Sequence, residues 1–212
     1  MKIAIIGATG MAGKAIYNEA AERGHEVTGI VRSEARGKEI LGSDARLLVK
    51  DAFDLQKDDL AHFDVIVNAF ATLPHEAYRH IDLTAQLIAQ FRETSEPRLF
   101  FILGAGSLLD ENDQPFIETI RTMPGADQFI AIPANQFKQL EFLRNVDNVN
   151  WVAVSPSLEF VEGPKQKPVI GKDHLLKTAD GNSRSTSTTV AVAILDEIEQ
   201  PQFKQERFTV SD

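Results

Sequence analysis

The sequence predicts an α/β fold in which a doubly wound parallel sheet carries helices on both faces. The first observation is a strand, glycine turn, helix and strand in succession, with apolar runs at 3–6 and 26–31 around a helical stretch at 12–23. The second is a set of further strand-like runs, most of them separated by helices, at 45–49, 64–68, 98–103 and 150–155. Such an alternation indicates parallel strands joined by right-handed crossovers. It places a ligand at the switch point between the first and fourth strands.

The turn after the first strand has the spacing G-x-x-G-x-x-G, formed by Gly7, Gly10 and Gly13. Gly7 permits the sharp turn off the strand, Gly10 lets backbone N–H groups approach a pyrophosphate, and Gly13 lets the helix pack close to the strand. The N-terminus of the helix adds unpaired N–H donors and a partial positive charge. We therefore predict a dinucleotide site here, with Thr9 and Met11 as further contact residues. A Walker A loop is excluded, because that motif needs a different glycine and hydroxyl pattern.

The end of the second strand bears on the choice of dinucleotide. NAD-preferring folds often have an acid about 20 residues after the glycine motif, whereas an Arg there accommodates the 2′-phosphate of NADP. Here the strand ends at Arg32, and the first acid, Glu34, lies two residues further on. Arg36 and Lys38 add positive charge. NADP(H) is therefore favoured over NAD(H), the alternative being that Arg32 is an ordinary solvated loop residue.

Two further strand ends carry candidate cofactor contacts. The carboxylate of Asp51 can accept a hydrogen bond from an adenine amino group, and Asp54 is expected to cap a short helix at 55–61. Turn and cap chemistry explains both acids equally well. After the fourth strand, Ala69 and Phe70 occupy a position where small neighbours leave room for a cofactor.

The fifth strand is followed by Gly104-Ala-Gly-Ser107, which lies in the predicted crevice. Gly104 is a candidate cofactor contact. Ser107 is a candidate for binding a substrate oxygen, or else a turn serine. His174 is the one histidine of the C-terminal segment, and it is a weak candidate for an acid or hydrogen-bond donor.

Two connecting segments and the tail complete the chain. We predict a helix at 75–93, an irregular surface flap at 110–132 and a small substrate-side lobe at 156–186, followed by a helix at 188–199 and a strand near 208–210. In the helix at 75–93, helical spacing assigns to the core Tyr78, Ile81, Ala85 and Ile88.

Length and composition set broad limits. The 212 residues suit one domain, 1–212, and a hydrophobic fraction of 43% suffices for a core. The formal net charge of −9 argues against nucleic acid and anionic membranes as partners. There is no cysteine, and no two histidines have metal-ligand spacing, so we predict no metal. No apolar run approaches a membrane span, and the N-terminal strand leaves no room for a cleaved leader, so we expect a cytoplasmic protein with a small-molecule partner.

These motifs resemble those of a known group. Gly7-Ala-Thr-Gly10-Met-Ala-Gly13, Arg32, Gly104–Ser107 and the tail segments at 180–184 and 191–199 are similar to the atypical short-chain dehydrogenases/reductases. Within them, the chain most resembles the NAD(P)H-binding group of NADH-flavin reductases, biliverdin IXβ reductase and NmrA-like proteins. The resemblance runs over nearly the whole chain. It implies a single Rossmann-type NAD(P)-binding domain and a reductase activity.

One feature departs from the wider superfamily. Most short-chain dehydrogenases use a Tyr-x-x-x-Lys pair, in which the Lys lowers the pKa of a Tyr that transfers the proton. Neither Tyr17 nor Tyr78 is followed by such a Lys, and Ala134 stands four residues before Lys138. Lys138 is either a ribose contact or a solvated helix residue.

The missing acid leaves three hypotheses. The first is hydride transfer from NAD(P)H to a flat conjugated acceptor, such as a flavin or a tetrapyrrole, which needs no strong protein acid. The second is a non-catalytic NmrA-like redox sensor that binds NAD(P). The third is an isomerase or epimerase acting on a nucleotide-linked substrate, which the missing Tyr disfavours because that chemistry uses the same pair.

Overall fold

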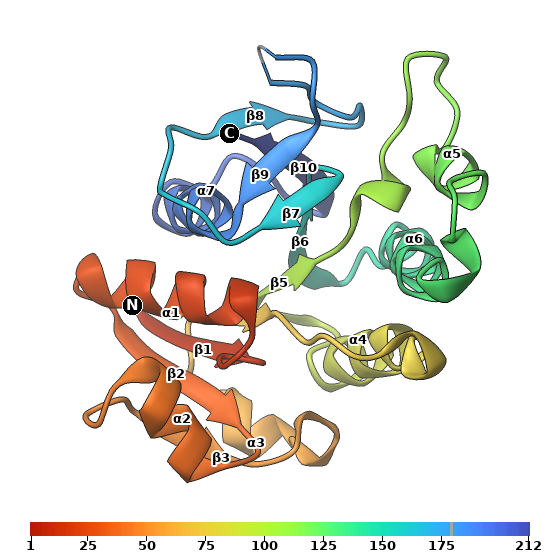
Figure 1. Ribbon diagram of the computed structural model, residues 1–212. Helices are drawn as coiled ribbons and strands as arrows, with labels where there is room; N and C mark the ends of the chain where they lie inside the picture. Colours follow the sequence, from red (N-terminus) through yellow and green to blue (C-terminus); the bar gives the residue numbers. More distant parts are fainter. Residues whose placement is uncertain (179) are drawn as a thin grey trace.

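The fold is described from a computed structural model that covers residues 1–178 and 180–212. Over these residues, eight strands form one sheet in the order β3-β2-β1-β4-β5-β6-β10-β8, and every neighbouring pair is parallel except β10 and β8 (Figure 1). In chain order its strands are β1 (Lys2–Ile6), β2 (Glu26–Val31), β3 (Leu47–Val49), β4 (Val65–Asn68), β5 (Thr94–Ile102), β6 (Val149–Pro156), β8 (Val169–Gly171) and β10 (Glu206–Ser211). The predicted doubly wound sheet and its switch point between the first and fourth strands, β1 and β4, are confirmed.

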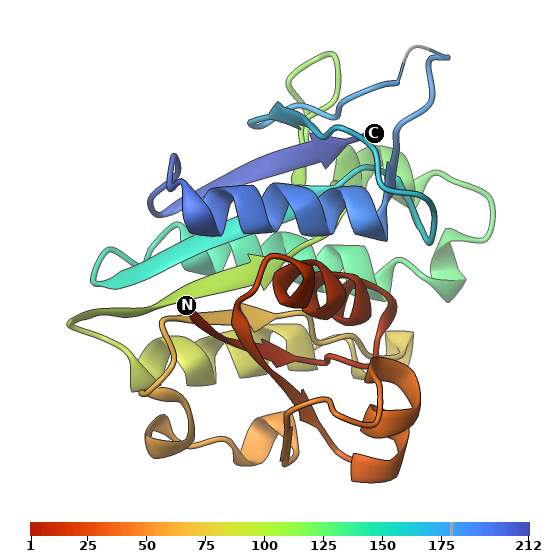
Figure 2. The ribbon, with the colours of Figure 1, turned by 90° about the vertical axis from the view of Figure 1, so that its left-hand side faces the viewer.

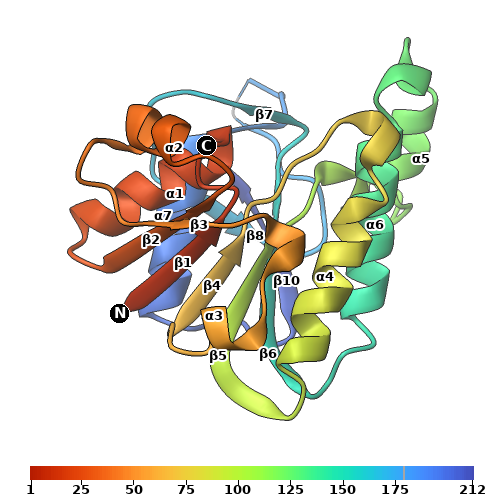
Figure 3. The same ribbon diagram turned by 90° about the horizontal axis from the view of Figure 1, so that it is seen from below.

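Helices cover both faces of this sheet. They are α1 (Met11–Glu22), α2 (Glu34–Leu41), α3 (Lys57–Leu60), α4 (Arg79–Gln90), α5 (Phe116–Arg121), α6 (Ala131–Leu143) and α7 (Ser187–Glu199). Figure 2 shows α1 and α7 side by side on one face. Figure 3 shows α4 and α6 together on the other.

The side chains of the strands alternate between two apolar layers, as the pleat requires. In β1, Ile3 and Ile5 pack on the α1/α7 side, whereas Ala4 and Ile6 pack on the α4/α6 side. Because both faces are buried, the central strands are apolar throughout, which explains why their sequences read as continuous hydrophobic runs. No helix in the described part of the chain is long and apolar enough to cross a membrane.

The C-terminal segment differs from the predicted lobe. Within 156–186, β7 (Glu159–Val161) and β9 (Arg184–Thr186) form a separate two-stranded parallel sheet. However, β8 joins the central sheet as an edge strand, and β10 inserts between β6 and β8. The tail therefore extends the main sheet as well as covering its strand ends. This pairing is non-local, and the local sequence pattern does not reveal it.

Two further predictions need correction. The segment 110–132 is not an irregular flap, because it contains α5, whose Phe116 and Ile120 pack in a small apolar cluster with Leu108. The helix predicted at 75–93 is a 3₁₀ turn at Pro74–Glu76 followed by α4, and Tyr78 is 55% exposed. The buried face of α4 carries His80, Leu83, Thr84, Leu87 and Ile88, so Ile88 is confirmed as a core residue, whereas Ile81 and Ala85 are only partly buried. Apolar spacing alone placed the face wrongly, because two members of the true face, His80 and Thr84, are polar.

Candidate functional site

The glycine turn connects β1 to α1 with very little free space. Gly7 has φ +75°, and a Cβ built on it would lie 2.7 Å from the carbonyl oxygen of Ala69 in the loop after β4. A Cβ on Gly13 would lie 2.2 Å from the carbonyl oxygen of Gly7. By contrast, a Cβ on Gly10 would have only one neighbour, the Gly7 carbonyl oxygen at 3.3 Å. Gly7 and Gly13 are therefore required by packing, whereas Gly10 leaves open space in front of α1.

This space belongs to a cavity of about 840 Å³ on the switch-point side of β1. Its walls come from the ends of β1, β2, β3 and β4. It brings together seven of the predicted cofactor residues, namely Gly7, Thr9, Gly10, Arg32, Asp51, Ala69 and Phe70. The structure thus gathers at one place residues that lie as many as 63 positions apart, from Gly7 to Phe70. 

The charged lining of this cavity is mostly basic. Arg32 and Arg36 are exposed, and neither has an ion-pair partner within 4.0 Å among the described residues. Lys50 is paired with Asp59, and the Arg79 guanidinium stacks on the Phe53 ring at 4.3 Å. The free cations are therefore the two arginines that follow β2.

The two acids after β3 have local roles. Asp51 Oδ1 accepts a hydrogen bond of 3.0 Å from the backbone N–H of Phe53 and caps a 3₁₀ turn at Ala52–Asp54, while the residue also lines the cavity. Asp54 does not cap a helix at 55–61, because α3 begins at Lys57 and its capping box is formed by Gln56 and Asp59. The side chains of Gln56 and Asp59 accept from each other's backbone N–H groups, and Asp54 takes no part in this capping box.

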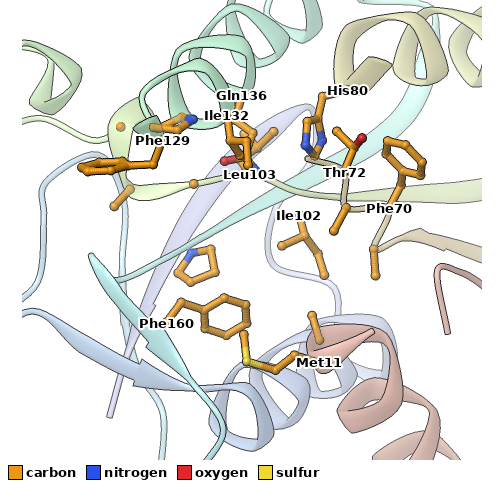
Figure 4. A pocket seen from close by; sticks show the side chains of 18 of the residues that line it. Met11, Phe70, Thr72, His80, Ile102, Leu103, Phe129, Ile132, Gln136 and Phe160 are labelled. Atoms are coloured by element: carbon orange, nitrogen blue, oxygen red, sulfur yellow. The ribbon is translucent and has the colours of Figure 1, made fainter. Parts of the chain in front are cut away.

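A second cavity, of about 390 Å³, adjoins the first and shares with it Gly10 and residues 69–72 (Figure 4). Its lining includes Met11 and Gly104, the other two predicted cofactor contacts that face a cavity. It is otherwise strongly apolar, with side chains from Phe70, Ile102 and Phe160. Among the residues that the structure describes, no Asp, Glu, Lys or Arg lines it. The two cavities together form an elongated site with a basic end and an apolar end.

Gln136 faces this inner cavity from α6, close to where a short-chain dehydrogenase would carry its Tyr. Its Oε1 lies so near Gly104 that a Cβ there would be 2.3 Å away. Gly104 therefore makes room for the amide. The search for a Tyr-x-x-x-Lys pair considers only Ala134 and Lys138 in this helix, and it does not identify Gln136. Lys138 is exposed and lines neither cavity.

The two predicted catalytic residues do not reach the cavity. Ser107 is buried, and its Oγ donates to the Gly104 carbonyl oxygen at 2.8 Å and lies 2.8 Å from Ser155 Oγ. Its hydroxyl is thus used to hold the turn after β5. His174 lies in an exposed loop, where its Nε2 is 2.7 Å from Asp113 Oδ1. Neither residue lines the inner cavity.

His80, on α4, is a lining residue that sequence reasoning passed over. It is only 4% exposed, its ring meets the Phe70 ring edge-on at 5.6 Å between centroids, and its Nε2 is buried with no hydrogen-bond partner. Burial lowers the pKa of His80 to about 4, because no nearby acid compensates the lost hydration of the imidazolium. The ring is therefore neutral near pH 7. An unpartnered buried polar atom of this kind costs about 1–3 kcal/mol.

This buried histidine predicts a pH dependence of stability. The native pKa of about 4 lies below the ordinary value of 6.5, so between these values the unfolded chain binds more protons than the native protein. Stability is therefore expected to rise from pH 4 to 6.5 and to be lost as the pH falls, by about 3 kcal/mol from His80 alone. Urea unfolding of the wild type and of His80→Phe at pH 7, 6, 5 and 4.5 measures this contribution. Equal losses in the two proteins would contradict it.

In the described residues, no group of three or more potential ligand side chains is arranged to hold a metal ion. The site instead consists of a glycine turn at a helix N-terminus, a basic cavity beside it and an apolar cavity beyond the switch point. Together with the parallel sheet, this arrangement defines a Rossmann-type dinucleotide-binding protein.

Comparisons with known proteins extend this assignment. The chain belongs to the NAD(P)H-binding family, whose profile matches residues 7–201. The uncharacterized protein YwnB of Bacillus subtilis (strain 168) is 37% identical over 215 residues, which cover 99% of this chain and 98% of YwnB. The resemblance to the NAD(P)H-binding group is thereby confirmed.

Solved structures agree with the fold. A Lactobacillus casei protein superposes with a TM-score of 0.94 at 37% identity, over 100% of this chain and 99% of that one. A Streptococcus pneumoniae TIGR4 protein, provisionally described as an NADH-flavin reductase, superposes with a TM-score of 0.90 at 33% identity, again over 100% and 99%. The chain is thus similar along its full length to these two proteins, one of which is provisionally described as an NADH-flavin reductase.

Proposed function

We propose that this protein is an NADPH-dependent reductase that transfers hydride to a flat conjugated acceptor such as a flavin. The observation that carries the proposal is the inner cavity, which is apolar, uncharged and continuous with the dinucleotide cavity at the switch point. The provisional description of the Streptococcus pneumoniae relative supports it.

The residues of the outer cavity fit a dinucleotide. Gly10 stands at the N-cap of α1 without a side-chain cap, so N–H groups of the first turn are free to bind a pyrophosphate. Gly10 itself has no Cβ to obstruct that approach. Arg32 and Arg36 would meet a 2′-phosphate at the other end. When bound, the reduced nicotinamide supplies the hydride.

The inner cavity fits a planar acceptor. Met11 and Phe160 form one wall, and Gln136 and His80 lie on the opposite side (Figure 4). Among the described residues that line this cavity, no Asp, Glu, Lys or Tyr is present to protonate a carbonyl substrate, so the acceptor must spread the incoming charge over its own conjugated system and take its proton from water. The protein positions the two rings and limits access of water.

The direct test is NADPH oxidation, followed by absorbance under anaerobic conditions, with FMN, FAD and a tetrapyrrole offered separately. Turnover with at least one acceptor is expected. Tight NADP⁺ binding in calorimetry without any turnover would instead favour the non-catalytic sensor. Turnover of a nucleotide-linked sugar without net NADPH consumption would favour an epimerase.

Replacing Arg32 by Ala tests the preference for NADP(H). The substitution removes a charge-assisted contact to the 2′-phosphate, which NADH lacks, so NADPH affinity should fall about tenfold while NADH affinity stays within about twofold. Calorimetric titration of both cofactors measures this difference. Arg121→Ala, an exposed residue outside both cavities, is the control and should leave both affinities unchanged. Equal losses for NADPH and NADH in the Arg32 variant would remove the argument for NADP.

A further inference from the structure

His80 holds a hydrogen-bonding position in the inner cavity that no group in residues 1–178 and 180–212 uses. The residue is 4% exposed, and its Nε2 has no partner. Buried polar atoms in folded proteins are nearly always paired with protein groups or ordered water. An unpaired one that lines a cavity is therefore available to an ordered water or to a ligand atom that displaces it.

The rest of the residue is held firmly. The His80 carbonyl oxygen accepts a hydrogen bond from Thr84 Oγ1 at 2.8 Å, and Thr84 Oγ1 in turn accepts from Gln139 Nε2 of α6 at 2.7 Å. The Phe70 ring packs edge-on against the imidazole. Figure 4 shows the ring at the α4/α6 side of the cavity, with Thr72 beside it and Gln136 nearby. This side of the cavity thus carries three neutral polar groups, namely the imidazole, the Gln136 amide and the Thr72 hydroxyl, which is already bonded to Glu76.

The charge pattern limits what this side can recognise. The described cavity residues that face His80 come from the loop after β4, from the end of β5 and from α6. None of them is Asp, Glu, Lys or Arg. The buried imidazole is neutral near pH 7, so it carries one N–H donor and one acceptor nitrogen and is not a proton source. Carboxylate or phosphate groups find no cation in this cavity. A neutral carbonyl oxygen is the partner that a neutral N–H donor fits best.

We propose that His80 donates a hydrogen bond from Nε2–H to a ring carbonyl of the acceptor, and that the inner cavity accepts only an uncharged, carbonyl-bearing planar ring. This inference rests on the proposed reductase function. Its ligand class includes an isoalloxazine head and a quinone, which share that chemistry. A charged tail such as a phosphate must remain outside the inner cavity.

The donor has a clear role in the reaction. Hydride from the reduced nicotinamide and one proton from water add to the acceptor, so the nicotinamide is oxidised and the acceptor gains two electrons. Negative charge develops on the conjugated carbonyl system as hydride arrives. A fixed N–H donor in an apolar surrounding stabilises this charge more than it stabilises the neutral ring. His80 would therefore affect kcat as well as binding.

The experiment measures binding of lumiflavin, FMN and menadione to the NADP⁺-loaded protein by fluorescence titration. In the wild type, lumiflavin or menadione should bind, and lumiflavin should bind at least as tightly as FMN. His80→Phe should weaken this binding about tenfold, whereas His80→Gln, which keeps a donor, should lose no more than about threefold. NADP⁺ affinity should stay within twofold in both variants. His62→Phe, an exposed site outside the cavities, should change nothing.

A thermal unfolding scan of the free variants separates binding from folding. His80→Phe removes an unpartnered polar atom from an apolar wall, so its unfolding midpoint should be no lower than that of the wild type. Acceptor binding that does not depend on His80, tighter binding of FMN than lumiflavin, or weaker NADP⁺ binding in His80→Phe would overturn this inference while leaving the reductase intact. A wild type that binds neither probe and oxidises no NADPH would overturn the reductase function itself.

Discussion

Replacing Gly13 by Ala is expected to destabilise the protein by about 3 kcal/mol and to abolish measurable dinucleotide binding. The added Cβ would lie 2.2 Å from the Gly7 carbonyl oxygen and 2.8 Å from Ala8 Cα, and both are backbone atoms that cannot rotate away. Relief of the clash must push α1 off β1. That movement distorts the turn whose N–H groups face the pyrophosphate. Urea unfolding and calorimetric titration with NADP⁺ measure the two effects.

Gly10→Ala is the matched comparison within the same turn. Its Cβ would meet only the Gly7 carbonyl oxygen, at 3.3 Å, and its φ of −81° suits alanine. Stability should therefore fall by only about 1 kcal/mol, from the poorer N-cap. NADP⁺ affinity should still fall at least tenfold, because the methyl group enters the space that the phosphates need. If Gly13→Ala unfolded like the wild type, or if Gly10→Ala bound NADP⁺ normally, the division of roles between the two glycines would be wrong.

The sequence predicts well which residues gather at the outer cavity, because the determinants of that end of the site are local. The glycine spacing, the strand before it and the helix after it lie within one short segment, and the handedness of crossovers places β4 beside β1. Arg32 and Ala69 then come to the same edge of the sheet as a consequence of strand order. These residues could be named without knowledge of any distant contact.

The apolar end was predicted poorly because its residues are selected by contacts between distant segments. His80 and Gln136 are polar residues on helices, and hydrophobic periodicity treats such residues as solvent-facing. Ser107 is the opposite case, because it is a polar residue that the sequence places in the site but the structure does not. Its hydroxyl is hydrogen-bonded to Gly104 and to Ser155 of the neighbouring strand. Only the packed structure shows which polar groups are satisfied internally and which are left for a ligand.

At the opposite end of the sheet, a buried pair of charged side chains is hydrogen-bonded entirely within the protein. There Arg98, on β5, is paired with Glu197 of α7, and the two residues are 8% and 4% exposed. The guanidinium also donates to the carbonyl oxygens of Glu197 and Phe203, at 2.9 Å and 2.7 Å. The Glu197 carboxylate accepts from the backbone N–H groups of Gln202 and Phe203. This cluster fixes the turn that leads from α7 into β10.

Arg98→Ala is therefore expected to lower the free energy of unfolding by about 3–5 kcal/mol, because it leaves a buried carboxylate without its counter-charge. Glu197→Gln, which removes the charge and keeps one of the two oxygen acceptors, tests the same pair from the other partner. Urea unfolding at pH 7 measures both losses. Arg98 lies about 13 Å along β5 from the cavity residue Ile102, so NADP⁺ affinity measured on folded protein should stay within about twofold. A loss of cofactor affinity with unchanged stability would mean that the cluster acts on the site and does not serve mainly to hold β10 in the sheet.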